Sequence, residues 1–420
     1  MTRGFRATGW MVVVGSTIAL IVGNGPVLLF TFGVFLKPIT EEMGWNRGTM
    51  SIGIGLGLTI AGLATPLLGR LIDRWGVQRI TLISVTLFSL SFSMIALTGT
   101  SVAAFIALYA FCGLLSSGHA PLPYAKAITF WFDERRGLAL GIAMAGVGVG
   151  TAVMPQVANV LVQTFGWRGA YAALGAVTWI VAFPAVLLFV KEPLDVRSDR
   201  QVAQVAGDEV GTAFRSGAFW MLATSVLLVV TAVNGTIAHL VALLTDRGMA
   251  SASATSMLVG VGISTIFGRL ISGYLLDRVF APRLAAIIFL VPIAGIVVLW
   301  FGGASPALAL ISAICFGFGL GAEVDVIGFL VGRYFGLRRY GEIYGYIFAL
   351  FTIGSGVGPF LMGLSFDATR SYERALIIFC VMLLVASVII FRIGPYRYPP
   401  PTQGSRSPTD AVQASSLIGV

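Results

Sequence analysis

Twelve apolar stretches follow one another along the chain, separated by charged and Gly/Pro-rich breaks. Each is roughly 20 residues long, enough to cross about 30 Å of hydrocarbon as a helix. Hydrophobic residues make up 57% of the 420 residues and charged ones only 11%, so little is left to cover a water-soluble surface. The sequence predicts an all-α integral membrane protein with helices near 9–36, 48–68, 79–98, 102–126, 138–163, 169–190, 217–244, 252–275, 284–302, 306–331, 341–364 and 373–393.

Residues of the same type recur at a constant offset of 204 positions, which marks the chain as a duplication. The matching pairs are Gly44 and Gly248, Gly69 and Gly273, Asp73 and Asp277, Arg74 and Arg278, Gly137 and Gly341, Gly141 and Gly345, Gly150 and Gly354, and Pro155 and Pro359. Two like-oriented halves of a membrane protein have one natural cavity, at the pseudo-twofold axis between them, and can rock around it. We therefore expect a transporter with six-helix halves at 1–190 and 217–394.

Two polar segments lie outside these halves. Residues 191–216 carry mixed charges and are expected to be a cytoplasmic linker, with room for a short surface helix. Residues 395–420 begin with a proline-rich run and have too little apolar content to pack. We expect them to be a disordered cytoplasmic tail.

The distribution of positive charge sets the predicted orientation. With both termini in the cytoplasm, cytoplasmic segments hold 19 Lys or Arg residues and the outer loops hold 6. This bias predicts a multi-pass protein of the plasma (bacterial inner) membrane with both termini cytoplasmic. It also accounts for the net charge of +9 together with anionic lipid, so no nucleic-acid partner is expected.

Patterns typical of catalysis or metal binding do not occur in the sequence. There is no Gly-x4-Gly-Lys-Ser/Thr phosphate loop, and the only two histidines, His119 and His239, fall in separate spans. Cys112, Cys315 and Cys380 lie in apolar spans without ligand spacing. We expect no enzyme activity, no metal and no cofactor, so the energy for transport must come from a gradient.

A glycine- and arginine-rich loop occurs twice in register. It reads Gly69-Arg70-Leu71-Ile72-Asp73-Arg74-Trp75-Gly76 in the first half and Gly273-Tyr274-Leu275-Leu276-Asp277-Arg278 in the second. It resembles the signature loop of the major facilitator superfamily, and the resemblance covers the whole chain. In such a loop glycine lets helices approach closely, and an acid at a helix end pairs with arginine or caps a neighbouring helix while the cytoplasmic side is closed. The resemblance implies a gating role for Gly69, Asp73, Arg74, Gly273, Asp277 and Arg278.

A narrower resemblance lies at the start of the fifth helix. The stretch 131–146, which contains Arg135 and Arg136, is similar to a motif of the monocarboxylate porters, and Gly9-Trp10 in the first helix fits the same family. The chain departs from that pattern at Glu134, where the motif has lysine, and at Phe30, where animal members have a lysine. The resemblance implies a bacterial branch of that family, with Arg135 and Arg136 in the gating region.

Arg269 lies eight residues before Asp277, and therefore about 12 Å from the inner end of its helix. A lone arginine at that depth costs about 2.5–3.5 kcal/mol on insertion scales, so it should face a wet cavity and have a partner. Arg269-x3-Gly273 also resembles the eighth-helix arginine that binds the substrate carboxylate in monocarboxylate porters and oxalate/formate exchangers. The aspartate that animal porters have one turn earlier is replaced here by Thr265.

An acid in the tenth helix lies at a matching depth. Asp325 is eight residues before Arg333, and Glu323 is ten residues before it. Because the eighth and tenth helices run in the same direction, either acid could pair with Arg269. Protonation of the acid would free the guanidinium to take a substrate carboxylate as a bidentate partner. The alternative is a permanent structural ion pair.

Other polar residues of the spans are weaker candidates for substrate contact. By the repeat register His119 is the counterpart of Glu323, so the two could face one another across the central axis; a hydrogen bond between helices is the alternative. Asn24 and Asn234 lie mid-way along the first and seventh helices, which should be loosened there, either to contact substrate or simply to bend. Tyr124 is a further cavity candidate, although aromatic residues on membrane helices usually serve packing.

Taken together, these features predict a carrier for a small organic anion, expected to be a monocarboxylate, with proton coupling and alternating access. It should work as a monomer in the lipid bilayer. Three alternatives stay open: an oxalate/formate-type exchanger, which would need a lysine in the eleventh helix; a drug-efflux antiporter, although the fifth helix has Met154-Pro155 in place of Gly-Pro; and a membrane sensor or scaffold without transport, which would have little reason to keep Arg269 beside an acid.

Overall fold

The computed structural model describes residues 3–132, 136–191, 207–276, 278–302, 305–336 and 338–398. Nearly all of this part of the chain is helical. The helices are α1 (Arg3–Ile21), η1 (Gly25–Leu29), α2 (Phe32–Met43), α3 (Arg47–Trp75), α4 (Val77–Met94), η2 (Ile95–Leu97), α5 (Val102–Ser116), η3 (Ser117–His119), α6 (Pro121–Thr129), α7 (Arg136–Phe189), α8 (Val210–Phe214), α9 (Gly217–Asp246), α10 (Ser251–Leu276), α11 (Ala281–Phe301), α12 (Pro306–Phe335), α13 (Tyr340–Thr369) and α14 (Glu373–Phe391).

Eleven segments of the described chain are long and apolar enough to cross a membrane. One of them, Leu138–Phe189, is 52 residues long and contains two crossings, because α7 reverses at Gly166, whose φ is 68° and ψ is 174°. The first crossing is built from α1, η1 and α2 together, and the fourth from α5, η3 and α6. The predicted arrangement of twelve transmembrane helices is therefore confirmed.

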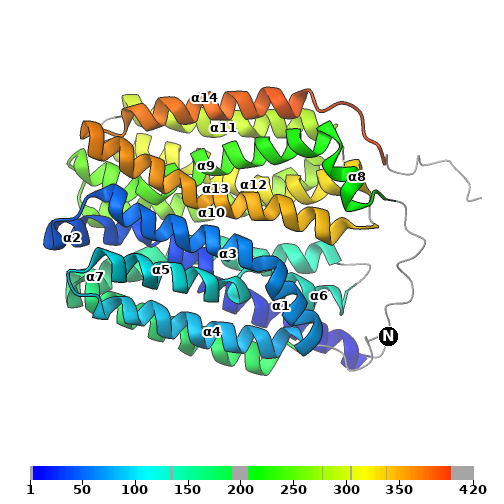
Figure 1. Cartoon of the computed structure of the whole chain (residues 1–420), viewed down its shortest axis with the longest axis horizontal. Helices are drawn as coiled ribbons and strands as arrows, with labels where there is room; N and C mark the ends of the chain where they lie inside the picture. The colour runs from blue at the N-terminus through cyan, green and yellow to red at the C-terminus, as the bar shows by residue number, and fades with distance from the viewer. Residues whose placement is uncertain are drawn as a thin grey trace, which may run out of the picture.

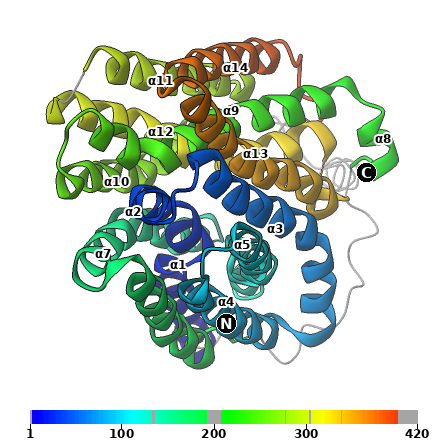
Figure 2. The same ribbon diagram turned by 60° about the vertical axis from the view of Figure 1, so that its left-hand side comes forward.

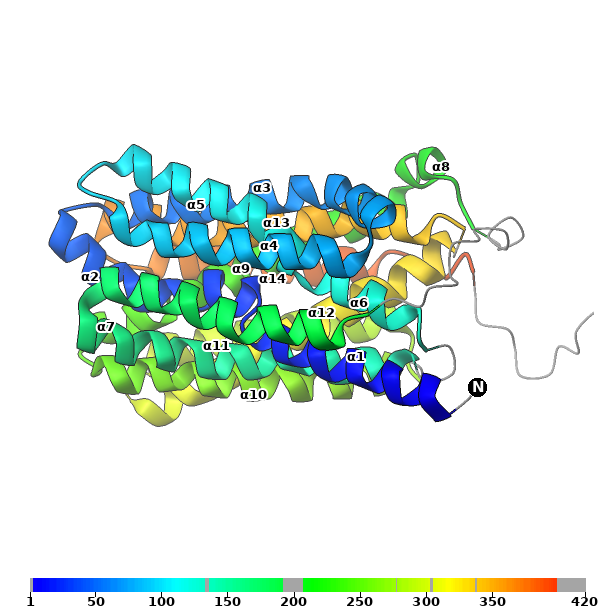
Figure 3. The ribbon, with the colours of Figure 1, turned by 90° about the horizontal axis from the view of Figure 1, so that it is seen from below.

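The crossings form two bundles that lie side by side. Helices α1 to α7 make the N-terminal half and α9 to α14 make the C-terminal half (Figures 1 and 2). The halves contact each other mainly through α3 against α13 and α7 against α10. The start of α1 and the short helix α8 lie at one end of the molecule, which we call the terminal end (Figure 3). The opposite end, where α2 finishes, is called the far end.

Backbone geometry repeats at the same offset of 204 residues as the sequence. Gly44 and Gly248, which follow the first crossing of each half, both adopt positive φ, at 67° and 91°. The reversal at Gly166 has its counterpart at Arg370, with φ values of 68° and 54°. Arg370 is the only residue other than glycine with positive φ in the described chain. The duplication therefore extends to the turns that end the helices.

The break predicted in the first helix is present, and the one predicted in the seventh is not. Helix α1 ends at Ile21, and a π-helical turn follows, where Asn24 Oδ1 accepts a hydrogen bond from the Gly25 backbone N at 2.8 Å. By contrast α9 runs unbroken past Asn234. A Cβ at Gly235 would lie 2.7 Å from the backbone of Gly358, so this glycine serves close packing between α9 and α13. The prediction of a loosened seventh helix is wrong for that reason.

Part of the segment expected to be a disordered tail is packed. Tyr398 donates from its backbone N to Arg333 O at 2.9 Å, and its hydroxyl bonds Asp208 Oδ1 at 2.8 Å. Arg397 pairs with the same carboxylate at 3.1 Å. Residues 395–398 thus do not fit the prediction of disorder, because aromatic and ionic partners hold them against α12. The rest of that prediction, at 399–420, and the linker residues 192–206 lie outside the described residues.

We predict that Gly166→Ala lowers the stability of the protein. Left-handed backbone costs a residue with a Cβ about 1–2 kcal/mol, and a Cβ at Gly166 would meet no atom within 4 Å, so the cost is purely conformational. Thermal unfolding in detergent, followed by fluorescence-detected size exclusion, measures it. Gly217→Ala is the matched control, since that site is equally open and has ordinary φ; an equal loss in both variants would contradict the assignment.

Candidate functional site

Arg269 on α10 and Asp325 on α12 form an ion pair inside the bundle. Arg269 Nη1 lies 3.8 Å from Asp325 Oδ1, and the two side chains are 14% and 28% exposed. The separation is within range of an ion pair and longer than a good hydrogen bond, so neither group is locked to the other. The pairing expected from the similar depth of these two residues in the membrane is therefore present.

Arg269 lies away from the exposed apolar side of its helix. On α10 the exposed apolar side chains include Phe267 and Tyr274, and at about 100° per residue Arg269 lies on the other side of the helix. Asp325 belongs to a partly exposed stripe of α12 that continues at Phe329 and Gly332. Arg269 therefore lies toward the neighbouring helices, where Asp325 pairs with it.

Glu323 lies close to Asp325 in sequence but in a different environment. It is 1% exposed, and neither of its oxygens has a hydrogen-bond partner among the described residues. Two residues along a helix correspond to a turn of about 200°, so Glu323 projects away from the face that holds Asp325. It does not share the ion pair with Arg269.

The expectation that His119 faces Glu323 is wrong. His119 is fully buried within the N-terminal half, where its ring nitrogens contact Val22 O at 3.0 Å and Tyr124 Oη at 2.7 Å. Tyr124 is fully buried as well. Repeat register assigns equivalent positions to two residues but does not set which way each helix is rotated. In this conformation His119 and Tyr124 bridge helices and do not reach the ion pair.

The two predicted asparagines have different surroundings. Asn24 is half-buried and caps the π-helical turn of the first crossing. Asn234 is 1% exposed and donates through Nδ2 to Ser355 Oγ on α13 at 2.8 Å. Its Oδ1 is buried without a hydrogen-bond partner in the described chain. Asn234 therefore keeps one unused acceptor between α9 and α13.

The signature-loop residues lie at the terminal end. A Cβ added at Gly69 or Gly273 would meet nothing within 4 Å, so neither glycine is at a close helix contact in this conformation. Arg74 and Arg278 are exposed, and Arg278 Nη1 donates to Tyr274 O at 3.1 Å. Arg135, Asp277 and the side chains of Asp73 and Arg136 lie outside the described residues, so the ionic contacts expected of them are not seen.

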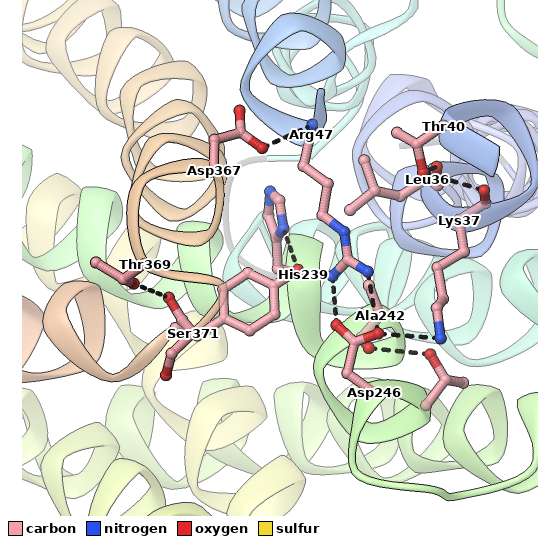
Figure 4. A network of polar contacts seen from close by, with 12 residues as sticks. Leu36, Lys37, Thr40, Arg47, His239, Ala242, Asp246, Asp367, Thr369 and Ser371 are labelled. Carbon is pink, nitrogen blue, oxygen red and sulfur yellow. Dashed lines mark hydrogen bonds and ion pairs between the residues drawn. The ribbon is translucent and has the colours of Figure 1, made fainter. Parts of the chain in front are cut away.

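At the far end, an ionic network joins the two halves. Asp246, at the end of α9, pairs with Lys37 at 3.0 Å and with Arg47, both from the N-terminal half (Figure 4). The guanidinium of Arg47 also lies 3.7 Å above the ring of Phe366 on α13. With Arg47 only 8% exposed, breaking these contacts would leave a poorly hydrated charge.

A chain of hydrogen bonds continues this network into the membrane. Arg47 donates to the Tyr372 hydroxyl, which lies 3.3 Å from His239 Nδ1. Burial raises the pKa of Tyr372, so its hydroxyl keeps a proton to donate to that nitrogen. His239 Nε2 then carries its hydrogen toward Pro359 O at 3.0 Å and Ser51 Oγ at 3.1 Å. His239 thus contacts both halves.

A carboxylate from the C-terminal half caps a helix of the N-terminal half. Asp367 on α13 accepts hydrogen bonds from the backbone N of Arg47 at 3.1 Å and of Gly48 at 2.7 Å, at the start of α3. Asn46, the residue before this helix, makes no side-chain cap of its own. An acidic side chain also interacts favourably with the helix dipole there. The first turn of α3 therefore depends on contact with the other half.

Glycines on the facing helices show how close the two halves come at each end of the molecule. A Cβ added at Gly55, Gly62, Gly262 or Gly363 would lie 2.5–2.9 Å from an atom of Gly356, Thr352, Gly148 or Gly48, respectively. These contacts bring α3 against α13 and α7 against α10. Toward the terminal end the same four helices carry glycines whose added Cβ would meet nothing within 4 Å, namely Gly69, Gly141, Gly273 and Gly345. The halves therefore touch at the far end and separate toward the terminal end.

Sequence reasoning missed the far-end network. Its partners are up to 325 residues apart, and in the sequence Lys37 and Arg47 are simply two of the six positive charges in the predicted outer loops. One signal was available: Glu42 and Asp246 are repeat counterparts at the ends of equivalent crossings. Glu42 pairs with Arg168 inside its own half, so the register points to both acids without indicating which one bridges the halves.

Comparison with known proteins decides the family. A family model described as Major Facilitator Superfamily matches residues 18–359. The chain belongs to the major facilitator superfamily. Its architecture agrees with that of a crystal structure described as a bacterial homologue of the human lysosomal transporter Spinster in an inward-facing and occupied conformation. That match has a TM-score of 0.69 at 18% identity and covers 94% of this chain and 97% of the other.

Curated relatives of this major facilitator protein are transporters. Human monocarboxylate transporter 11 is 27% identical over 91% of this chain and 82% of its own length. Rat monocarboxylate transporter 13 is 26% identical, over 92% and 89%. The Escherichia coli K12 protein YhjX, described as an uncharacterised MFS-type transporter, is 24% identical over 84% and 87%. The chain is therefore a multi-pass membrane transporter of this superfamily and not an enzyme.

We predict that Asp246→Asn loosens the far end. The amide loses both ion pairs, to Lys37 and to Arg47, so the halves of this facilitator should separate more often there. Asn159→Cys with Ser251→Cys provides a reporter, because Ser251 Oγ donates to Asn159 Oδ1 across the halves at 2.9 Å. Oxidative cross-linking of that pair should fall about fivefold, equivalent to roughly 1 kcal/mol for a partly buried ionic contact.

The matched control is Glu42→Gln in the same double-cysteine background. Glu42 lies at the same end, but its partners Arg168 and Trp167 belong to its own half. Cross-linking should therefore stay unchanged in this variant. A yield that is equally reduced in both variants, or unchanged in Asp246→Asn, would contradict the assignment of Asp246 as the bridging acid.

Proposed function

We propose that this protein is a secondary active transporter for a small organic anion, a monocarboxylate, that moves together with a proton by alternating access. The observation that carries the proposal is the pair of Arg269 and Asp325. One permanent cation and one titratable acid lie 3.8 Å apart at membrane depth, and both are partly exposed. Ionisable groups in that position are functional by default.

The chemistry of the two side chains gives each a distinct role. Arginine does not lose its proton, and its planar guanidinium matches a carboxylate with two parallel N–H bonds. Aspartate can take up a proton, and a neutral Asp325 no longer competes for the guanidinium. Protonation of Asp325 would thus free Arg269 to bind the substrate carboxylate.

This exchange keeps the net charge of the site constant. Without substrate, the guanidinium is balanced by the Asp325 carboxylate. With substrate, it is balanced by the bound carboxylate, and Asp325 is neutral. Because the electrical cost of moving a charge through the low-dielectric interior is large, the halves should rearrange in these two balanced states and not in a half-loaded one. Proton and anion would then cross together.

Two further findings support the proposal, one for the substrate class and one for the energy source. The relatives named monocarboxylate transporters 11 and 13 align with more than nine-tenths of this chain. The sequence has no phosphate-binding loop, which leaves an ion gradient as the energy source. Asp325 is favoured over Glu323 as the proton carrier, since Asp325 contacts Arg269 and is the more exposed of the two acids.

The charge distribution supports an orientation. Nineteen of the 27 Lys and Arg residues fall on segments that the sequence predicts to be cytoplasmic, and six fall on predicted outer loops. We assign the terminal end to the cytoplasm of a bacterial inner membrane, with the protein working as a monomer. In that orientation the separated halves correspond to an inward-open conformation, and the network of Arg47 and Asp246 is the closed outer gate.

We predict that Arg269→Ala abolishes carboxylate uptake. Proteoliposomes with an imposed inward proton gradient should accumulate one or more of lactate, pyruvate, acetate, oxalate and branched 2-oxo acids. The variant should lose about 100-fold of that rate, since a charge-assisted bidentate contact is worth roughly 3 kcal/mol. Arg283→Ala, which removes an exposed arginine from the start of α11 in the same half, is the control. Uptake of charge-neutral drugs together with no uptake of any carboxylate would refute the proposal.

We predict that Asp325→Asn uncouples transport from pH. The amide cannot be protonated, so anion-for-anion exchange should persist while the proton gradient no longer drives accumulation. Parallel measurement of counterflow and of gradient-driven uptake separates the two. Glu323→Gln lies on the same helix without contact to Arg269 and should retain coupling. Uncoupling by Glu323→Gln in place of Asp325→Asn would move the proton site to the buried acid.

A further inference from the structure

Four aromatic rings form a continuous stack along α13. The ring centroids of Tyr340 and Tyr344 are 5.8 Å apart, those of Tyr344 and Phe348 5.8 Å, and those of Phe348 and Phe351 5.2 Å. The rings are nearly parallel, with interplanar angles of 16°, 18° and 6°. Spacings of four, four and three residues keep all of them on one face of the helix. We call these four residues the aromatic ladder.

The aromatic ladder lies on the side of α13 away from lipid. The exposed apolar residues Tyr346, Val357 and Leu364 mark the lipid face of this helix. At about 100° per residue, Phe348 and Phe351 lie roughly opposite that face. All four ladder residues are half-buried, so their rings are partly accessible from the space between helices.

The ladder begins beside the proposed anion site. The Tyr340 hydroxyl donates to the backbone O of Gly328 at 3.1 Å, three residues past Asp325 on α12. Tyr344 lies within electrostatic range of both Arg269 and Asp325. Phe348 is eight residues into α13, or about 12 Å, and Arg269 is seven residues from the end of α10, or about 10 Å. Phe348 and Arg269 are therefore at nearly the same depth.

The ladder ends at a polar contact. One turn beyond Phe351, Ser355 Oγ donates to Phe351 O at 2.9 Å and accepts from Asn234 Nδ2 at 2.8 Å. Tyr344 to Phe351 spans seven residues, about 10 Å, which fits one aromatic ring and a short side chain. In the described part of the chain, the ring contacts of Phe348 and Phe351 all lie within the ladder. No ring from another helix occupies their accessible side there.

We propose that the transported acid carries an aromatic ring, with its carboxylate on Arg269 and its ring on Phe348 and Phe351. This inference rests on the proposed function, because it uses Arg269 as the anchor for the carboxylate. An offset or edge-to-face contact between rings adds roughly threefold to tenfold to binding beyond the burial of apolar area. A short aliphatic acid makes the ionic contact and gains nothing from the ladder.

The test compares acids that differ only by a phenyl group. Proteoliposomes with an inward proton gradient are given pyruvate or phenylpyruvate, and in parallel lactate or 3-phenyllactate, with uptake into protein-free liposomes subtracted. Initial rates at low substrate should favour the phenyl acid about tenfold or more in the unmodified protein. Because both acids are measured in the same preparation, the ratio of their uptake rates does not depend on how much of each variant folds.

Phe348→Leu and Phe351→Leu keep apolar bulk and remove the ring. Each should reduce the ratio of phenylpyruvate to pyruvate uptake about threefold to tenfold. Tyr346→Leu is the matched control: it removes an aromatic residue from the lipid face of the same helix and should leave the ratio unchanged. A ratio that falls equally in all three variants overturns the role of the ladder.

The outcomes separate this inference from the proposed function. Equal or faster uptake of pyruvate and lactate in the unmodified protein overturns the aromatic substrate and leaves the anion carrier standing. A phenyl preference that persists in the Phe348→Leu, Phe351→Leu double variant overturns the ladder as its cause. Uptake of neutral 3-phenylpropanol with no uptake of any acid overturns both, because Arg269 would then not be the anchor.

Discussion

The cost of placing charge in a low-dielectric interior organises this molecule. Removing one partner of a buried ion pair costs much more free energy than the intact pair contributes to stability. Each buried charged group therefore needs a partner in every populated state. Arg269 and Asp325 are paired within the C-terminal half, on α10 and α12, and the pair is loose enough to respond to a ligand. Arg47 and Asp246 are paired between the halves, and that pair responds to their separation. In the proposed mechanism, substrate binding would break the first pair and separation of the halves would break the second.

The features that follow from length, hydropathy and repetition were predictable from the sequence. Apolar stretches gave the twelve crossings because lipid leaves few alternatives to a helix. Depth counted from helix ends put Arg269 level with two acids, Asp325 and Glu323, and the structure shows that Asp325 is its partner. The constant offset was visible in the sequence, and the structure extends it to the turns at Gly166 and Arg370. These properties are local or periodic, so a single sequence contains them.

What could not be predicted depends on helix rotation and on contact between distant segments. Register made His119 and Glu323 equivalent, yet the first bridges helices in its own half and the second projects away from Arg269. Asn234 suggested a loosened helix, but the adjacent Gly235 is a packing contact with α13. The far-end network joins α3, α9 and α13 across hundreds of residues, and the repeat register does not indicate which of its two acids bridges the halves. The spacing of the aromatic ladder is visible in the sequence, although only the fold shows that its face turns away from lipid.

The glycine contacts at the far end have a practical consequence. Opposing backbones of α3 and α13 meet there with no side chain between them, as at Gly55 and Gly356. A methyl group added at Gly55 would lie 2.9 Å from Gly356 O, so it would disfavour this conformation relative to one in which the halves separate there. Such substitutions could be placed at different heights along the interface between the halves. They would form a graded series of variants that favour a conformation open at the far end, for structure determination or inhibitor selection.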